Sequence, residues 1–244
     1  MATAVVDGRP VAVTGGGDMA VRVWDLAAGE QVGKPLTGHP GSVNAVATVT
    51  LDGRPVAVTG SYALECCGIN DGDCCGGEVI DEDDFCYICT NCSDPNYGTV
   101  LVWDLTTGER IDKPLTAHHD DVLAVATAVV DGRPVAVTGS AEGAVLVWDL
   151  AAGEPVGEPL TGHTGAAGAV ATGVVDGRPV AVTGGGDGVV RVWDLTARQQ
   201  MGAPLVFPEP VSALAVARDG RLAVAFGREI AVLTAAHRQE PRDS

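Results

Sequence analysis

Positive charge is scarce in this sequence, and the shortage excludes two classes of partner. The 244 residues include 15 Lys and Arg against 32 Asp and Glu, which gives a formal net charge of −17 at pH 7. Nucleic acids and anionic membrane surfaces are bound through clustered cations. We therefore expect neither nucleic acid nor a membrane as a partner.

Long apolar runs are also lacking. No stretch approaches the roughly 20 residues that a transmembrane helix needs. Residues 1–13 contain no basic region followed by an apolar run, so the sequence predicts no secretory signal. We expect a cytoplasmic protein, whose thiols stay reduced.

Aromatic residues make up only 4% of the chain, and cysteine is absent outside residues 61–98. Most of the sequence consists instead of one unit that is copied. The nine residues DGRPVAVTG start at Asp7, Asp52, Asp131 and Asp176, and a diverged copy, DGRLAVAFG, starts at Asp219. The first and second copies are 45 residues apart, as are the third and fourth, but between the second and third 34 extra residues are inserted. A period of this length predicts stacked supersecondary units.

Each unit has the pattern of four antiparallel strands. Residues 42–51 are apolar and roughly alternating, which is typical of a strand. Asp52-Gly53 follows, a pair that favours a two-residue hairpin turn, and the next strand begins with a proline. Beyond the insert, residues 99–105 and 109–116 complete the set. Four such strands make one blade of a β-propeller.

Two dipeptides recur at fixed places in these units. The third strand ends in Trp-Asp four times, at Trp24-Asp25, Trp103-Asp104, Trp148-Asp149 and Trp193-Asp194. Gly-His precedes the first strand at Gly38-His39 and Gly162-His163, with Ala117-His118 in the equivalent place. The units therefore resemble WD40 repeats over nearly all of the chain outside the insert. The resemblance implies an all-β, WD40-type β-propeller of about five four-stranded blades.

The resemblance also implies a buried hydrogen-bonded set of His, Thr, Asp and Trp in each blade. The fourth blade would use His163, Thr183, Asp187 and Trp193; the third His118, Thr138, Glu142 and Trp148; and the second His39, Thr59 and Trp103, with Tyr97 where Asp is expected. Since buried polar groups need partners, we interpret these residues as structural. His119 and His237 fall outside the sets, and no nucleophile motif accompanies them. We expect no enzyme activity.

The fifth unit is incomplete. It offers strands at residues 211–218, 221–226 and 229–234, but no outer strand before a polar tail at residues 236–244. Three arrangements fit: a five-bladed ring with a weak seam, an open arc, or a truncated propeller. Exposed strand edges would favour self-association of an open arc.

The insert, residues 62–97, divides the propeller into residues 1–61 and 98–235. It replaces the turn between the second and third strands of the second blade and contains no Lys or Arg. Clustered thiols in a reducing compartment favour a metal, and four sulfurs would make a zinc site. The candidate ligands are Cys66, Cys67, Cys74, Cys75, Cys86, Cys89 and Cys92.

Oxygen ligands for calcium are a second hypothesis for the insert, supplied by Asp71, Asp73, Asp81 and Asp83. Two further alternatives remain open. The cysteines could form disulfides, which would leave one thiol over, or the segment could be a disordered acidic loop.

The resemblance to WD40 propellers implies that the insert lies on the face that commonly binds partners. We expect the anchors to be aromatic, with acidic neighbours: Tyr62, Phe85, Tyr87, Tyr97, Asp120 and Asp121. The main hypothesis is a non-catalytic protein-interaction scaffold that binds through this face. The alternatives are a metal-binding or redox module on a propeller stand, and a truncated propeller without a present function.

Overall fold

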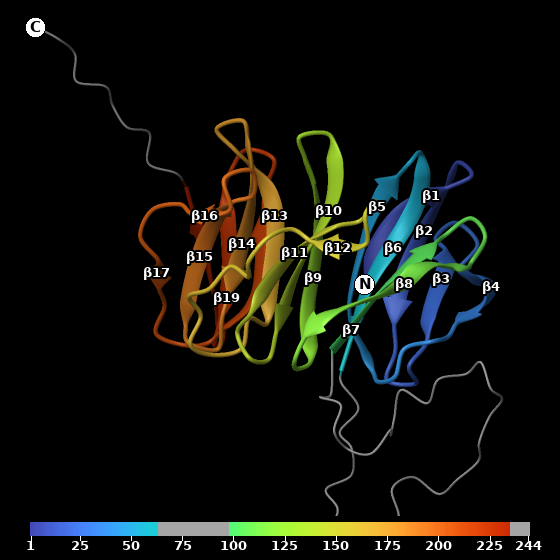
Figure 1. Cartoon of the computed structure of the whole chain (residues 1–244), viewed down its shortest axis with the longest axis horizontal. Coiled ribbons are helices and arrows are strands. Elements are labelled where there is room, and N and C mark those ends of the chain that lie inside the picture. Colours follow the sequence, from blue (N-terminus) through green and yellow to red (C-terminus); the bar gives the residue numbers. More distant parts are fainter. Residues whose placement is uncertain (63–97, 235–244) are drawn as a thin grey trace, which may run out of the picture.

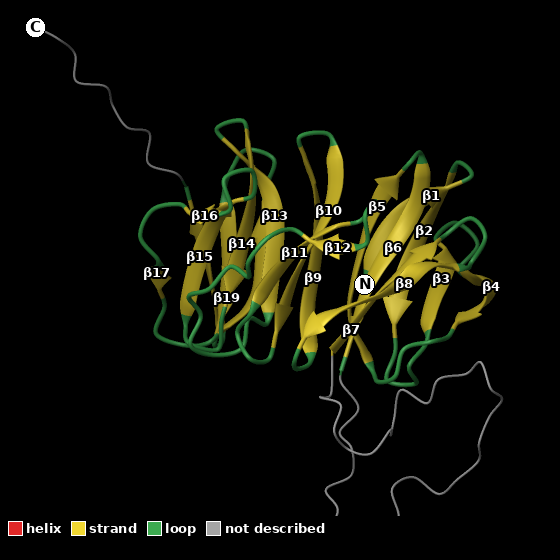
Figure 2. Cartoon of the chain, in the orientation of Figure 1, coloured by secondary structure: helices red, strands yellow, loops and turns green. Residues whose placement is uncertain are grey.

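The computed structural model describes residues 1–62 and 98–234, and every regular element in these ranges is a β-strand (Figure 2). The polar tail at residues 236–244 and nearly all of the insert lie outside the described residues. The strands form five antiparallel sheets. The predicted all-β class with blade-like sheets is confirmed.

Each sheet corresponds to one sequence repeat, and we call the sheets blades 1 to 5 in chain order. Blade 1 contains β1 (Ala2–Val6), β2 (Arg9–Gly15), β3 (Val21–Asp25) and β4 (Glu30–Leu36). Blade 2 contains β5 (Val43–Leu51), β6 (Arg54–Ser61), β7 (Gly98–Asp104) and β8 (Arg110–His118). Blade 3 contains β9 (Val122–Val130), β10 (Arg133–Ser140), β11 (Val145–Asp149) and β12 (Glu154–Pro155).

Blades 4 and 5 depart from the four-strand pattern at their outer edges. Blade 4 contains β13 (Ala169–Val175), β14 (Arg178–Gly184) and β15 (Val189–Asp194), and its outer strand is divided into β16 (Gln199–Gln200) and β17 (Leu205–Val206), which both pair with β15. Within the described residues blade 5 has three strands, β18 (Val211–Val216), β19 (Leu222–Phe226) and β20 (Glu229–Leu233). The incomplete last blade was predicted from the sequence and is confirmed.

The repeated Asp-Gly pair makes the same tight turn in blades 1 to 4. Asp7, Asp52, Asp131 and Asp176 have φ angles of 49–50°, and each is followed by a glycine whose φ is 76–78°. Two successive positive φ angles define the type I′ turn, whose twist matches that of the flanking strands. In blade 5 the first two strands are joined by a longer loop, because Val216 pairs with Leu222.

The core lies between the blades. Strand alternation gives each blade two apolar faces. We call the face toward the next blade the forward face and the one toward the preceding blade the backward face. At the first junction the forward valines Val11 and Val13 pack with Ala57 and Trp103 from the backward face of blade 2. Similar clusters fill the next three junctions.

Close approach of the blades explains the glycine that ends each repeated strand. A Cβ atom on Gly60 would overlap Val122 of the next blade, and one on Gly184 would overlap Val211. Only a residue without a side chain allows the second strand of one blade to come this close to the first strand of the next.

A ladder of threonine hydrogen bonds joins the inner strands. The hydroxyl of Thr48 donates to the carbonyl of Thr3 at 2.7 Å, Thr127 donates to Thr48 at 2.8 Å, and Thr172 donates to Thr127 at 2.6 Å. These threonines occupy one register position in blades 1 to 4. In blade 5 that position holds Leu214, which pairs with Val224 as Thr127 pairs with Ala136.

The five blades succeed one another as an open arc, from the blue blade 1 to the orange and red blades 4 and 5 (Figure 1). The described residues form no closed ring. The two ends are therefore different surfaces: the backward face of blade 1 and the forward face of blade 5.

Candidate functional site

The insert joins the scaffold at two points, which we call its first and second roots, and these lie at the ends of adjacent strands of blade 2. Strand β6 ends at Ser61 and β7 begins at Gly98, and the strands pair from Gly60 opposite Val100 onward. In blade 3 the equivalent turn is the two residues Ala141-Glu142. The insert therefore leaves the scaffold on the face that carries the turns between second and third strands, which we call the insert-bearing face.

Tyr62 stands at the first root and is the one predicted aromatic anchor that the structure describes. Its backbone N–H donates to the carbonyl of Ser42 at 3.0 Å, and the residue is 41% exposed. The Ser42 hydroxyl donates in turn to the carbonyl of Gly17 in blade 1, at 3.4 Å. Tyr62 is thus fixed through its backbone while its side chain faces solvent.

Asp120 lies against the second root. A Cβ atom on Gly98 would overlap the carbonyl of Asp120, so the chain passes this residue at close range. The carboxylate of Asp120 accepts from the N–H of Asp121 at 2.8 Å, and the carbonyl of Asp121 accepts from Ala141 at 3.0 Å. Two predicted acidic contact residues are therefore gathered where the insert rejoins the scaffold.

The remainder of the insert-bearing face is tied together through its backbone. Ala167 donates to the carbonyl of Ser140 at 2.9 Å, and Val211 donates to that of Gly185 at 3.1 Å. Each bond links a turn of one blade to the start of the next. The loops are therefore held in place relative to one another.

The buried sets of blades 2 to 4 share one hydrogen-bond pattern. Each Trp Nε1–H donates to the blade's Thr hydroxyl at 2.8 Å, and the His Nε2 lies 2.6–2.8 Å from the same oxygen. Because the Trp Nε1–H can only donate, the Thr hydroxyl oxygen accepts from it in every set. In blade 2 the hydroxyl of Thr59 also lies 3.3 Å from the carbonyl of Leu101, to which it can donate. Trp24 and Thr14 of blade 1 make the same Trp–Thr bond, at 2.9 Å.

Among the described residues, an acidic side chain contacts the histidine of its set in blade 4. The Asp187 carboxylate lies 3.2 Å from His163 Nδ1 and accepts from the N–H of Thr164 at 3.0 Å. Burial raises the pKa of Asp187, but hydrogen bonds from Thr164, Val189 and His163 outweigh it, and the net shift is downward.

In blade 3 the longer Glu142 reaches a different atom. Its carboxylate accepts from the N–H of His119 at 3.4 Å. Within residues 1–62 and 98–234, Nδ1 of His118 has no hydrogen-bond partner. The glutamate therefore occupies the acidic position without completing the set.

Burial keeps these histidines neutral. It lowers the pKa of His39 and of His118 from 6.5 to about 4, and it lowers that of His163 too, although Asp187 opposes the change. Such imidazoles are poor proton donors near neutral pH. Their geometry assigns them to the scaffold.

Blade 5 fills the same positions with aromatic rings, which the sequence patterns did not reveal. Phe207 stands four residues before Val211, as His163 stands four before Ala167, and Phe226 replaces the threonine. The two ring centroids are 4.9 Å apart. The sequence signal that could have identified Phe207 was its spacing of four residues before the first strand of the blade.

The opposite face carries the Asp-Gly-Arg turns. In blades 2 to 4 each of these arginines pairs with the Asp at the end of the third strand. Arg54 pairs with Asp104 at 3.3 Å, because β7 ends beside the start of β6. The other two pairs are Arg133–Asp149 at 3.8 Å and Arg178–Asp194 at 3.5 Å. Arg221 alone keeps its turn partner, Asp219.

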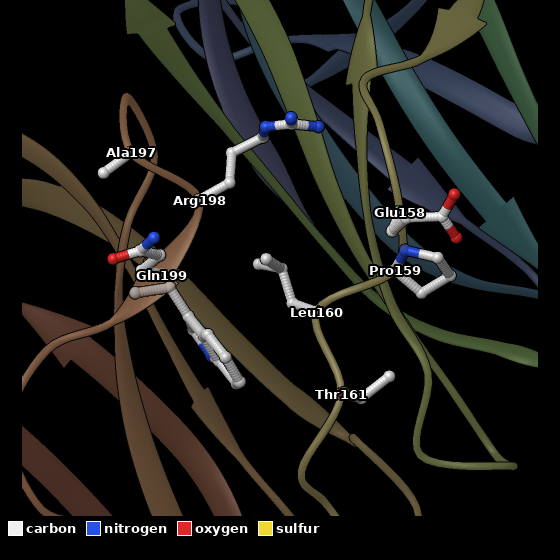
Figure 3. Close-up of a pocket in the computed structure, with 8 residues that line it drawn as sticks. Glu158, Pro159, Leu160, Thr161, Ala197, Arg198 and Gln199 are labelled. Carbon is white, nitrogen blue, oxygen red and sulfur yellow. The ribbon is translucent and has the colours of Figure 1, made fainter.

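A groove of about 280 Å³ lies away from both faces, between the segment after β12 and the turn before β16 (Figure 3). Arg198 donates from its guanidinium to the carbonyl of Val156 at 2.7 Å, so the cation is already engaged. The lining contains no His, Cys or Ser, so it offers no nucleophile and base pair: Glu158, Pro159, Leu160, Thr161, Trp193, Ala197, Arg198 and Gln199.

The predicted metal ligands cannot be placed, because all seven cysteines, together with Asp71, Asp73, Asp81 and Asp83, lie outside the described residues; so do Phe85, Tyr87 and Tyr97. Within residues 1–62 and 98–234, no group of three or more His, Cys, Asp and Glu side chains could hold a metal ion. The same ranges contain no helix long and apolar enough to cross a membrane.

The blade-like sheets and the repeated Trp–Thr–His sets give the described residues the fold class of a WD40-type β-propeller that does not close into a ring. The comparison with family models agrees: residues 153–194 match the family described as WD domain, G-beta repeat. This range runs from the end of blade 3 through the Trp-Asp of blade 4, so the prediction of WD40 repeats is confirmed. No curated protein matches the chain.

Proposed function

We propose that the chain is a non-catalytic scaffold that binds a protein partner on its insert-bearing face. WD40 repeats mediate protein–protein interaction in general, and the chain contains such a repeat. The observation that carries the proposal is the position of the insert, which emerges between Tyr62 and Asp120 on an otherwise regular face.

Side-chain size supports a partner that contacts the insert roots. The equivalent turns in blades 1 and 4 hold Gly17 and Gly186, which offer little area for binding. Interface energies are dominated by large side chains, above all Trp, Tyr and Arg. Tyr62 is exposed at the root, and the insert contains the three further aromatic residues.

Charge supports a partner with a cationic surface. Asp120 and Asp121 lie at the second root, Glu142 is exposed on the neighbouring turn, and nine acidic residues lie within the insert. Opposite potentials speed association and select partners. Binding should therefore weaken as ionic strength rises.

Replacing residues 62–97 with Ala-Glu, the turn of blade 3, gives a sharp test. Affinity capture with the full chain and with this variant, quantified by mass spectrometry, should show partners lost from the variant. A double variant on the opposite face, Arg133→Ala with Arg178→Ala, is the matched control and should retain them. Capture that survives the replacement in full would contradict the proposal.

A zinc-binding module is the second candidate, favoured by one observation. The pairing of β6 with β7 brings together the two ends of a segment that holds seven cysteines, three of them at Cys86-x2-Cys89-x2-Cys92. Thiolates in this spacing suit zinc. Elemental analysis should find near-stoichiometric zinc in the full chain and none in the Ala-Glu variant. Equal metal in both proteins would exclude the cysteines as ligands.

A further inference from the structure

We infer that the two ends of the arc bind each other between copies, so that blade 5 of one chain packs face to face on blade 1 of another. The inference goes beyond the proposed function, because it concerns neither the insert nor the insert-bearing face. It also differs from pairing through strand edges, since whole blade faces make the contact.

The forward face of blade 5 is apolar and uncovered. Cross-strand pairing places Ala215, Ala223 and Val232 in one row and Ala213, Ala225 and Ile230 in the next. Ile230 is 76% exposed and Val232 is 61% exposed. On the other side of the same sheet, Val224 and Phe226 pack against blade 4. The exposed face is therefore one side of a sheet whose other side is already buried.

The backward face of blade 1 is the complementary surface. The chain contains four tryptophans, and each stands on a backward face. Trp103, Trp148 and Trp193 are 1–3% exposed because the preceding blade covers them. Trp24 is only half-buried, although it makes the same bond to Thr14. Trp24 stays partly exposed because no forward face of another blade packs against it.

The chain itself shows four times how these two surfaces fit. At the third junction the forward valines Val135 and Val137 pack with Ala181 and Trp193 of blade 4. At the free end of blade 5 the equivalent positions, counted from the repeat Asp, hold Ala223 and Ala225. The outer row compensates for these smaller residues, because Ile230 stands where blade 3 has Val147. The forward face of blade 5 and the backward face of blade 1 can therefore pack together as a fifth junction of the same kind.

The ladder of threonine hydrogen bonds supports the same arrangement, in which blade 5 of one copy precedes blade 1 of the other. Each threonine donates to the carbonyl at the ladder position of the preceding blade, so Thr3 holds the next donor in the series. Thr3 is exposed, and its hydroxyl has no acceptor within the described parts of the chain. Leu214 occupies the ladder position of blade 5, and a backbone carbonyl can accept whatever the side chain. In the intermolecular junction Thr3 donates to the Leu214 carbonyl of the other copy.

Such a junction is heterologous, because different surfaces of the two copies meet. Heterologous contacts close into rings or extend into chains of copies, rather than stopping at a two-fold dimer. The full chain should therefore show a mass that rises with concentration in sedimentation equilibrium.

Three lysine variants make the inference testable. Ile230→Lys changes the blade 5 face and Thr3→Lys changes the blade 1 face; both residues are exposed, so the fold should persist. Val129→Lys is the matched control, an equally large change at a valine that is 57% exposed but lies on neither end. Each end variant alone should be monomeric, and the control should associate like the unmodified chain.

Mixing the two end variants gives the decisive result. Each retains one intact end, so the mixture should form a one-to-one dimer that does not grow further. A full chain that stays monomeric at every concentration would overturn the inference. So would association that both end variants leave unchanged, or association that is lost when residues 62–97 are replaced by Ala-Glu.

Discussion

The rings of Phe207 and Phe226 pack 4.9 Å apart at the two positions that His163 and Thr183 occupy in the preceding blade. Both members of the polar pair are replaced together, so neither is left buried without a partner. Replacing both partners of a hydrogen bond by apolar groups costs little, whereas removing one leaves a buried group unsatisfied. Blade 5 therefore shows that the polar set is one of two ways to fill this space.

Removing a single member of the set should destabilise the chain. Thr138→Val keeps the shape but leaves Trp148 Nε1–H and His118 Nε2 without their shared partner. Each unsatisfied buried group costs about 1–3 kcal/mol. With two such groups, denaturant unfolding should show a loss of about 2–6 kcal/mol, while Thr196→Val, at an exposed position, should have little effect. Equal midpoints for the two variants would contradict the structural role of Thr138.

Shortening the acidic side chain of blade 3 should complete its set. Glu142→Asp places a carboxylate as in blade 4, where Asp187 contacts His163 Nδ1. We expect a gain of about 1 kcal/mol, typical of one added hydrogen bond, and a rise in the pKa of His118 measured by NMR. The reverse change, Asp187→Glu, should cost a similar amount. An unchanged pKa of His118 would show that the carboxylate does not reach it.

Stability should fall with acidity in a window set by two histidines. His39 and His118 have pKa values near 6.5 when unfolded and about 4 when folded, so between these values the unfolded chain binds more protons. Their contribution is complete above pH 6.5 and is lost as the pH falls toward 4. Each shift corresponds to a loss on the order of 3 kcal/mol.

Denaturant unfolding at a series of pH values would measure this loss. Asp25 and Asp187, whose pKa values are lowered, lose their contributions as the pH falls through 3.8 and below, so the two windows separate. The double variant His39→Gln with His118→Gln should reduce the slope of the curve between pH 6.5 and 4, where His163, whose pKa is also lowered, still contributes. A curve of unchanged slope would exclude these histidines as its cause.

The scaffold should tolerate loss of the insert. Replacing residues 62–97 with Ala-Glu reproduces the β10–β11 turn on strands that already pair in the same register. We expect an unchanged circular dichroism spectrum and a free energy of unfolding within about 1 kcal/mol, as for surface changes. A collapse of stability would mean that the insert contributes to the core.

Local patterns in the sequence predicted the blades well. The Asp-Gly pairs gave the hairpins, the alternation gave the faces, and the missing outer strand of blade 5 followed from counting segments. These features depend on residues close together in the chain. The four-residue spacing that places Phe207 was present too, but it became meaningful only beside His163.

Relations between strands could not be read in this way. The pairing of Arg54 with Asp104 joins residues separated by the whole insert. The shift of the ladder position in blade 5 to Leu214 follows from a longer hairpin loop, which changes the register without changing the motif. The failure of Glu142 to reach His118 depends on one methylene and on the path of two loops.

The similarity of the repeated hairpins also affects how the chain folds. Strands β6 and β10 have identical sequences, RPVAVTGS, and their hairpin turns have the same angles. During folding strand β6 or β10 can enter the place of the other, because their own sequences do not distinguish them. Exchange of similar units is a characteristic misassembly of repeat proteins. Correct blade order must therefore come from late contacts between neighbouring faces, and refolding should include a slow phase in which misplaced blades are released.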